Sequence, residues 1–180
     1  MTIEEIFSKR MSKPEINNVV AWASGSSSNI LSLWHLANSE DRLTSVNALW
    51  TLTHLHQDDE IYIAALRNEM IDMLLNETDI AKKRLLLSIL KKQEYEADNI
   101  RTDFLNYCLS KINSESEPYA IRCFSLYTAF KMCRHFSELI EELKIHLDMM
   151  KYQPLSPGLK SALRQTKERI DKLNTVKALE

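Results

Sequence analysis

An arginine recurs three times inside helix-like apolar patterns, at Arg84, Arg122 and Arg164. The spacings are 38 residues, from 84 to 122, and 42 residues, from 122 to 164. Repetition at this period is typical of helix pairs that stack on one another, so it predicts an elongated all-α repeat fold. The repeat indicates an architecture and carries no sign of a particular reaction.

The residues before the arginines extend the repeat. Ala120-Ile121-Arg122 matches Ala162-Leu163-Arg164, and Ser45-Val46-Asn47 lies 37 residues before Arg84 with asparagine in place of arginine. Apolar residues also recur at helical intervals, most clearly in the series Ile100, Phe104, Leu105, Cys108, Leu109 and Ile112. This spacing places them on one face of a helix.

The composition of the 180 residues fits a folded helical domain. Hydrophobic residues make up 44% and charged residues 27%, while two glycines and four prolines leave little material for the turns of a many-stranded sheet. The first residues lack a signal-peptide pattern, and no apolar run approaches the roughly 18 residues of a membrane span. We therefore expect a cytoplasmic protein with no membrane partner.

Helix start signals divide the chain into candidate repeats. We expect a single domain over 1–180, with cap helices in 1–38, helix pairs in 39–77, 78–115 and 116–155, and a capping helix in 156–180. Whether the first 25 residues pack as a cap stays open.

This organisation resembles the HEAT and armadillo-like repeat families. The resemblance rests on the segment from Tyr119 to Met132 and on its echo from Ser161 to Arg164, and it covers roughly residues 14–174. It implies an α-α superhelix, a solenoid of about four helix pairs plus a terminal helix. In such a superhelix the first helices of the pairs line the outer surface and the second helices line the concave one. The functions of these families are diverse, so the fold alone does not define an activity.

The three arginines are the candidate partner-binding residues. Equivalent positions in stacked repeats would align the guanidinium groups of Arg84, Arg122 and Arg164 in a row that can bind carboxylate or phosphate. The alternative is structural, with each arginine bound to the C-terminus of a neighbouring helix or to an acidic residue. The acidic candidates are Glu77, Asp79, Glu115 and Glu117.

Other conspicuous residues have simpler explanations. Trp22, Trp34 and Trp50 lie in helical apolar patterns, which favours core positions over a binding groove. His54 and His56 are two residues apart, so on a helix they point about 200° apart and do not form a metal site. The cysteines, Cys108, Cys123 and Cys133, are odd in number and form no C-x-x-C pair, which indicates reduced core residues. We expect no metal and no cofactor.

No catalytic or nucleotide-binding motif is visible in the sequence, and two glycines do not build a phosphate-binding loop. The sequence therefore favours a non-catalytic scaffold that binds another protein through its concave face. A first alternative is a nucleic-acid-binding or DNA-repair-related protein that uses the basic residues within 82–92 and 160–177, although the net charge of −2 argues mildly against it. A second alternative is a homo-oligomer in which another copy covers the face with Ile100, Phe104 and Cys108. The oligomeric state stays open.

Overall fold

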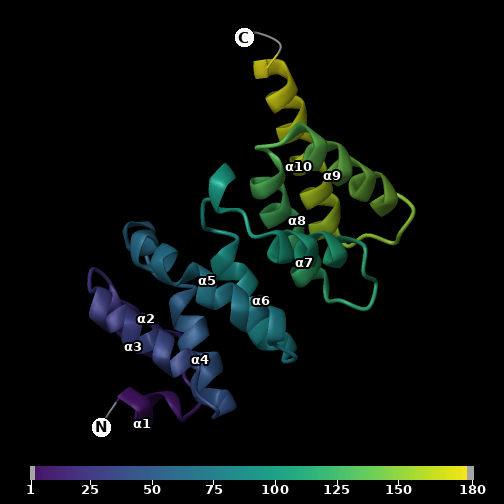
Figure 1. Ribbon diagram of the computed structural model, residues 1–180. Helices are drawn as coiled ribbons and strands as arrows, with labels where there is room; N and C mark the ends of the chain where they lie inside the picture. The colour runs from purple at the N-terminus through teal and green to yellow at the C-terminus, as the bar shows by residue number, and fades with distance from the viewer. Residues whose placement is uncertain (1–2, 178–180) are drawn as a thin grey trace. The chain divides into compact units, whose positions relative to one another are not determined.

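The computed structural model describes residues 3–177, which form ten α-helices, two short 3₁₀ helices and no strand (Figure 1). In chain order the α-helices are α1 (Ile3–Phe7), α2 (Lys13–Ala23), α3 (Ser27–Ala37), α4 (Arg42–Leu52), α5 (Glu60–Asn76), α6 (Ile80–Leu90), α7 (Thr102–Ile112), α8 (Tyr119–Cys133), α9 (Ser137–Met150) and α10 (Pro157–Lys177). The 3₁₀ helices are η1 (Gln57–Asp59) and η2 (Ala97–Asn99). The predicted all-α class is confirmed.

Local side-chain chemistry sets several helix starts. Asp41 accepts from the backbone N–H of Thr44 at 2.7 Å, and Asp79 accepts from that of Ala81 at 2.8 Å, so each carboxylate caps the first turn of a helix. The break between α2 and α3 occurs at Gly25, whose φ of 76° suits a residue without a side chain. Each of these residues lies directly at the boundary of the helix that it starts or separates.

The chain divides into two compact units, one ending at Gln93 and one beginning at Glu94. In the first unit α3 packs on α4 and α5 on α6, while α4 also lies between α2 and α6. We take α1–α2, α3–α4 and α5–α6 as the helix pairs of this unit. Their second helices, α2, α4 and α6, form one layer, and α3 and α5 lie in the other.

In the second unit α7 packs on α8, α8 packs on α10, and α9 contacts α7, α8 and α10. Phe104 and Cys108 on α7 are completely buried, and the Phe104 ring lies beside that of Tyr95. This corrects the expectation that the face with Ile100, Phe104 and Cys108 is available to a second copy, because its central residues already lie in the core.

Each of α4 and α8 packs most extensively on the helix that precedes it in the chain, whereas the sequence-based grouping pairs it with the helix that follows. The expected pair 39–77 contains α4 and α5, whereas the extensive packing joins α3 to α4. In the same way α7 packs chiefly with α8, which the expected grouping places in different pairs, 78–115 and 116–155. The helix starts were largely located by the sequence signals, but their partners were shifted by one helix.

Candidate functional site

Arg122, the central one of the three candidate arginines, lies in the core of the second unit. The residue is 2% exposed. Its Nε donates to the backbone carbonyl of Ile112, the last residue of α7, at 2.9 Å, and its Nη2 donates to Oε1 of Gln153. A cation at the C-terminus of a helix is stabilised by the unpaired carbonyls and by the helix dipole. Arg122 therefore joins helices and is not accessible to a partner.

The Arg122 contacts continue into a polar network. Nε2 of Gln153 donates to the carbonyl of Asn113 at 3.2 Å, and Nδ2 of Asn113 donates to the carbonyl of His146 at 3.0 Å. The network ties the end of α7, the start of α8 and the last turns of α9 together. Sequence reasoning missed Gln153 and Asn113, although an asparagine directly after a helix is a known C-terminal signal.

Arg84 and Arg164 have environments different from that of Arg122. Arg84 is exposed on α6, and none of the ion pairs between described residues involves it. Arg164 is exposed on α10, where its Nη1 lies 3.2 Å from Oε1 of Glu168, one turn further along the helix. The structure thus gives the three arginines no common role, and only Arg84 and Arg164 are accessible.

Counting from the N-cap of each second helix shows that Arg84 and Arg122 do not occupy equivalent positions. The residues four positions after the N-cap are Ser45 in α4, Lys83 in α6, Arg122 in α8 and Lys160 in α10. Ser45 performs the same task as Arg122, since its Oγ donates to the carbonyl of Ala37, the last residue of α3, at 2.6 Å. Arg84 comes one residue after the equivalent position, and one residue turns the side chain by about 100° around a helix, which carries it out to the surface.

Helices α4 and α6 lie side by side in parallel orientation and in register. Near their starts, Nε of Arg42 lies 2.6 Å from Oδ2 of Asp79. Near their ends, Nζ of Lys92 donates to the carbonyl of Thr53 at 2.7 Å. Contacts at both ends mean that residues at equal distances from the two N-caps are neighbours.

Each of these two helices leaves one stripe accessible. The stripe of α4 contains Leu43, Val46 and Trp50, and the stripe of α6 contains Arg84, Ser88 and Lys91. The members lie two, five and nine positions after the N-cap in α4, and five, nine and twelve positions after it in α6. Since the helices are parallel and in register, the stripes face the same side, and we call them together the α4–α6 surface. Apolar side chains on α4 adjoin cationic and polar ones on α6.

The Arg42–Asp79 pair at the edge of this surface is electrostatically stabilised. Burial raises the pKa of Asp79, but the Arg42 guanidinium and the backbone N–H groups of Lys82 and Ala81 outweigh this effect and hold the pKa below its usual range. Asp79 is therefore a carboxylate near neutral pH, and it serves both as a helix cap and as an inter-helix contact.

A second accessible face, the α8–α10 surface, consists of Cys123, Tyr127 and Lys131 on α8 and Arg169 on α10. The guanidinium of Arg169 lies 5.8 Å from the centre of the Tyr127 ring, a cation–π distance. Lys131 is 3.0 Å from Glu94, which neutralises part of its charge. Both cations of this surface thus have partners within the protein.

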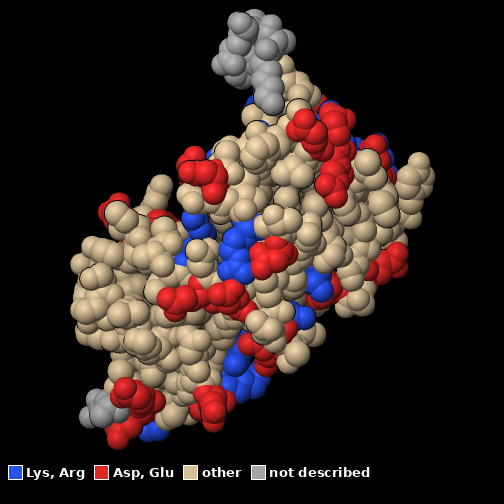
Figure 2. All heavy atoms as spheres, viewed as in Figure 1, with Lys and Arg blue, Asp and Glu red and all other residues tan. Residues whose placement is uncertain are grey.

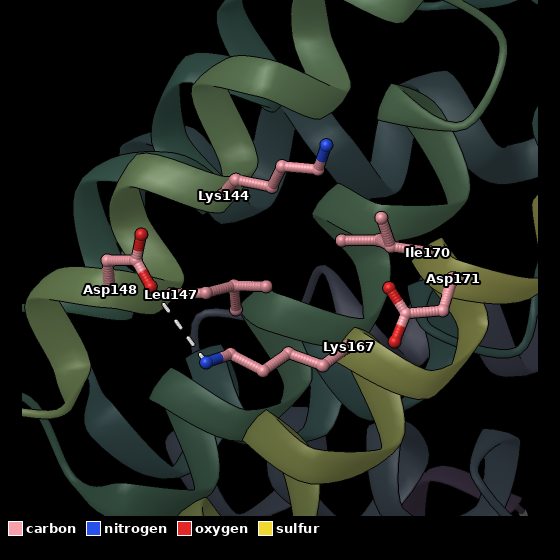
Figure 3. A pocket seen from close by; sticks show the side chains of 6 residues that line it. All are labelled: Lys144, Leu147, Asp148, Lys167, Ile170 and Asp171. Atoms are coloured by element: carbon pink, nitrogen blue, oxygen red, sulfur yellow. Dashed lines mark ion pairs between the residues drawn. The ribbon is translucent and has the colours of Figure 1, made fainter. Parts of the chain in front are cut away.

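A groove of about 230 Å³ lies between α9 and α10 (Figure 3). Its lining residues are Lys144, Leu147 and Asp148 from α9 and Lys167, Ile170 and Asp171 from α10. The two helices contribute the same pattern, lysine, aliphatic residue and aspartate, and Nζ of Lys167 lies 3.9 Å from Oδ1 of Asp148 across the groove. Charges of both signs compensate each other here, so the arrangement suits attachment of α10 to α9.

The tryptophans do not share one environment. Trp34 is a core residue whose Nε1 donates to Oε2 of Glu69 at 2.7 Å, as favoured from the sequence. Trp22 is 44% exposed on α2, beside Ile3, Ile6 and Val19. Trp50 is half-buried on the α4–α6 surface.

The histidine and cysteine side chains have structural surroundings. Nδ1 of His54 lies 2.9 Å from the carbonyl of Trp50, one helical turn earlier. In the described part of the chain no three His, Cys, Asp or Glu side chains form a group able to hold a metal ion. Cys108 and Cys133 are buried free thiols, and Cys123 is a partly exposed one.

Lys and Arg side chains on the face shown in Figure 2 lie next to Asp and Glu side chains and do not form one uninterrupted basic area. Among residues 3–177, none of the helices combines the length and the apolarity that crossing a bilayer requires.

Comparison with known proteins agrees with the helical repeat. The family model described as HEAT repeat domain matches residues 3–170. No curated protein and no solved structure shows significant similarity to the chain. The matched range contains the complete set of helices from α1 to α9 and most of α10, and the chain belongs to the HEAT repeat family.

Proposed function

We propose that this protein is a non-catalytic scaffold that binds another protein through the accessible stripes of its second helices. The observation that carries the proposal is the α4–α6 surface, where a tryptophan and two aliphatic side chains stay partly accessible beside an exposed arginine. Tryptophan and arginine are the residue types that contribute most to binding energy at protein interfaces. The grouping 39–77 and 78–115 makes α4 and α6 first helices, which the HEAT resemblance places on the outer surface. With the pairing α3–α4 and α5–α6 they are second helices, which the resemblance places on the concave side, and we adopt this assignment.

Of the three arginines first considered, Arg84 is the one that we retain as a contact on this surface. Arg164 remains a candidate only as an exposed cation of the terminal helix, and Arg122 supports the fold. The α8–α10 surface, with Tyr127 and Arg169, is a second contact area within the same proposed function.

A pull-down from the native lysate, in which the captured proteins are identified and quantified, tests the proposal. The wild-type chain is compared with two variants, Val46→Asp on the α4–α6 surface and Tyr127→Ala on the α8–α10 surface, and with Ile61→Ser as a control on the exposed side of a first helix. We expect a stoichiometric protein partner that is lost or strongly reduced with at least one surface variant and retained with Ile61→Ser. A partner retained equally by all variants, or no stoichiometric partner, contradicts the proposal.

A further inference from the structure

The charge on α6 has one sign. From Ile80 to Lys92 the chain has five cationic residues and no Asp or Glu: Lys82, Lys83, Arg84, Lys91 and Lys92. Some of them have internal tasks, since Lys82 lies 3.8 Å from Glu77 and Lys92 donates to Thr53. Arg84 is exposed in the middle of the helix and is engaged in no ion pair between described residues. The α4–α6 surface therefore presents a guanidinium that is available for an external anion.

The apolar half of the surface lies directly beside this charge. Leu43, Val46 and Trp50 occupy successive turns of α4 and extend over about 10 Å, since each residue advances a helix by about 1.5 Å. Arg84 and Val46 are equally far from the N-caps of their helices. The Arg84 side chain therefore leaves α6 beside Val46, the central residue of the apolar stripe. A complementary ligand needs an apolar ridge about two helical turns long with carboxylates along one flank.

We infer that the α4–α6 surface binds an acidic amphipathic segment of a partner protein. Apolar side chains of the segment pack on Val46 and Trp50, and its carboxylates pair with Arg84, with Lys91 and Lys92 adding favourable potential. The planar guanidinium fork of Arg84 matches a carboxylate in two-point geometry. This inference rests on the proposed scaffold function and specifies the chemistry of its partner.

The same cations do not favour nucleic acid to the same degree. A phosphate backbone has no group that covers the apolar stripe of α4, whereas binding of a protein segment removes that stripe from water. Proteins that bind single strands stack successive bases on several aromatic residues among the cations, and the six residues of the α4–α6 surface include one aromatic side chain, Trp50.

A selection from a displayed library of random 16-residue peptides tests the inference. The library is selected on the immobilised full chain and then depleted on the double variant Arg84→Glu/Lys91→Glu. A separate portion of the selected library is depleted on Lys172→Glu/Lys160→Glu, which makes the same charge change on exposed residues of α10; this matched control is expected to remove the peptides that survive depletion on the α6 variant. Melting curves followed by circular dichroism show that each variant is folded.

We expect peptides that survive depletion on the α6 variant to be rich in Asp and Glu and to carry apolar residues three or four positions apart. Their affinity is expected to fall about tenfold or more on Arg84→Glu/Lys91→Glu, because reversed charges place like charges together, and to stay within about twofold on the α10 control. Val46→Asp is expected to weaken the same peptides.

Other outcomes separate this inference from the proposed function. Peptides that bind the wild type and the α6 variant equally support a protein-binding scaffold but overturn the acidic partner for the α4–α6 surface. A selection that yields no binding peptide on any surface counts against both. Surviving peptides that are basic or uncharged, or a 20-base-pair DNA duplex that binds the wild type and is lost with the α6 variant, overturn the inference.

Discussion

Replacement of Arg122 by alanine is expected to be among the most destabilising single changes in the second unit. The substitution removes two hydrogen bonds of a charged donor, a buried one to the carbonyl of Ile112 and a part-buried one to the side chain of Gln153. Hydrogen bonds to charged groups contribute about 1.5–3 kcal/mol each. With partial compensation by entering water, we expect Arg122→Ala to lower the free energy of unfolding by about 3–5 kcal/mol.

The matched control is Arg164→Ala, which removes the arginine that the sequence repeat aligns with Arg122. Arg164 is 66% exposed at its side chain and pairs with Glu168 within one helix. Exposed pairs of this kind contribute a few tenths of a kcal/mol, so the control is expected to change the free energy of unfolding by less than about 0.5 kcal/mol.

Urea unfolding followed by circular dichroism measures both variants, with the slope of the transition as a check that the same surface is exposed on unfolding. A Gln153→Ala variant and the double variant complete a cycle, and their effects are expected to be less than additive because the two residues share one hydrogen bond. If Arg122→Ala and Arg164→Ala lower stability equally, or if both change it by less than about 1 kcal/mol, the structural role of Arg122 is refuted.

Two further predictions concern the carboxylate at the start of α6 and the thiols. Asp79→Asn keeps a capping side chain but loses the charge beside Arg42, so it is expected to cost about 0.5–1 kcal/mol at pH 7. Because the pKa of Asp79 is lowered in the folded state, the stabilisation by its carboxylate is present above the unfolded-state pKa of about 4 and is lost as the pH falls through the lower folded-state pKa. Urea unfolding at pH 7 and pH 3 should therefore show that the stability difference between wild type and Asp79→Asn becomes smaller at the lower pH. Among the cysteines, only Cys123 is expected to react rapidly with iodoacetamide at pH 8, because burial raises the pKa of the Cys133 thiol to about 12 and that of Cys108 well above its usual range. Mass spectrometry of tryptic peptides locates the label, and fast labelling of Cys108 in the folded chain would contradict the described packing.

The sequence was sufficient for the helices because their signals are local. Apolar spacing, the caps Asp41 and Asp79 and the break at Gly25 act within a few residues, and each lies near the helix boundary that it predicts. The pairing of helices is not local. In a repeat every helix has neighbours on both sides, and α4 buries residues towards α2, α3 and α6 at once, so its apolar pattern does not reveal which partner is packed most extensively.

The candidate site was predicted only in part for a related reason. The arginine spacing suggested equivalent positions, but equivalence in a stacked helix depends on the distance from the N-cap, and a shift of one residue moves a side chain by about 100°. Arg122 is consequently buried while Arg84 is exposed. The α4–α6 surface joins residues about 40 positions apart, from Val46 to Arg84, and became visible only when the contacts at both ends of α4 and α6 fixed their register.

Ser45 offers the sharpest test of the equivalence that is counted from the N-caps. The arginine-based alignment gives Ser45 no special task and places Asn47 opposite Arg84, whereas the N-cap count makes Ser45 the counterpart of Arg122. Ser45→Ala leaves the carbonyl of Ala37 without its buried donor and is expected to lower the free energy of unfolding by about 1–2 kcal/mol. Ser88→Ala, on the accessible stripe of α6, makes the same chemical change and is expected to stay within about 0.5 kcal/mol of wild type. Equal effects of the two substitutions in urea unfolding would mean that the shared position after the N-cap has no common structural role in α4 and α8.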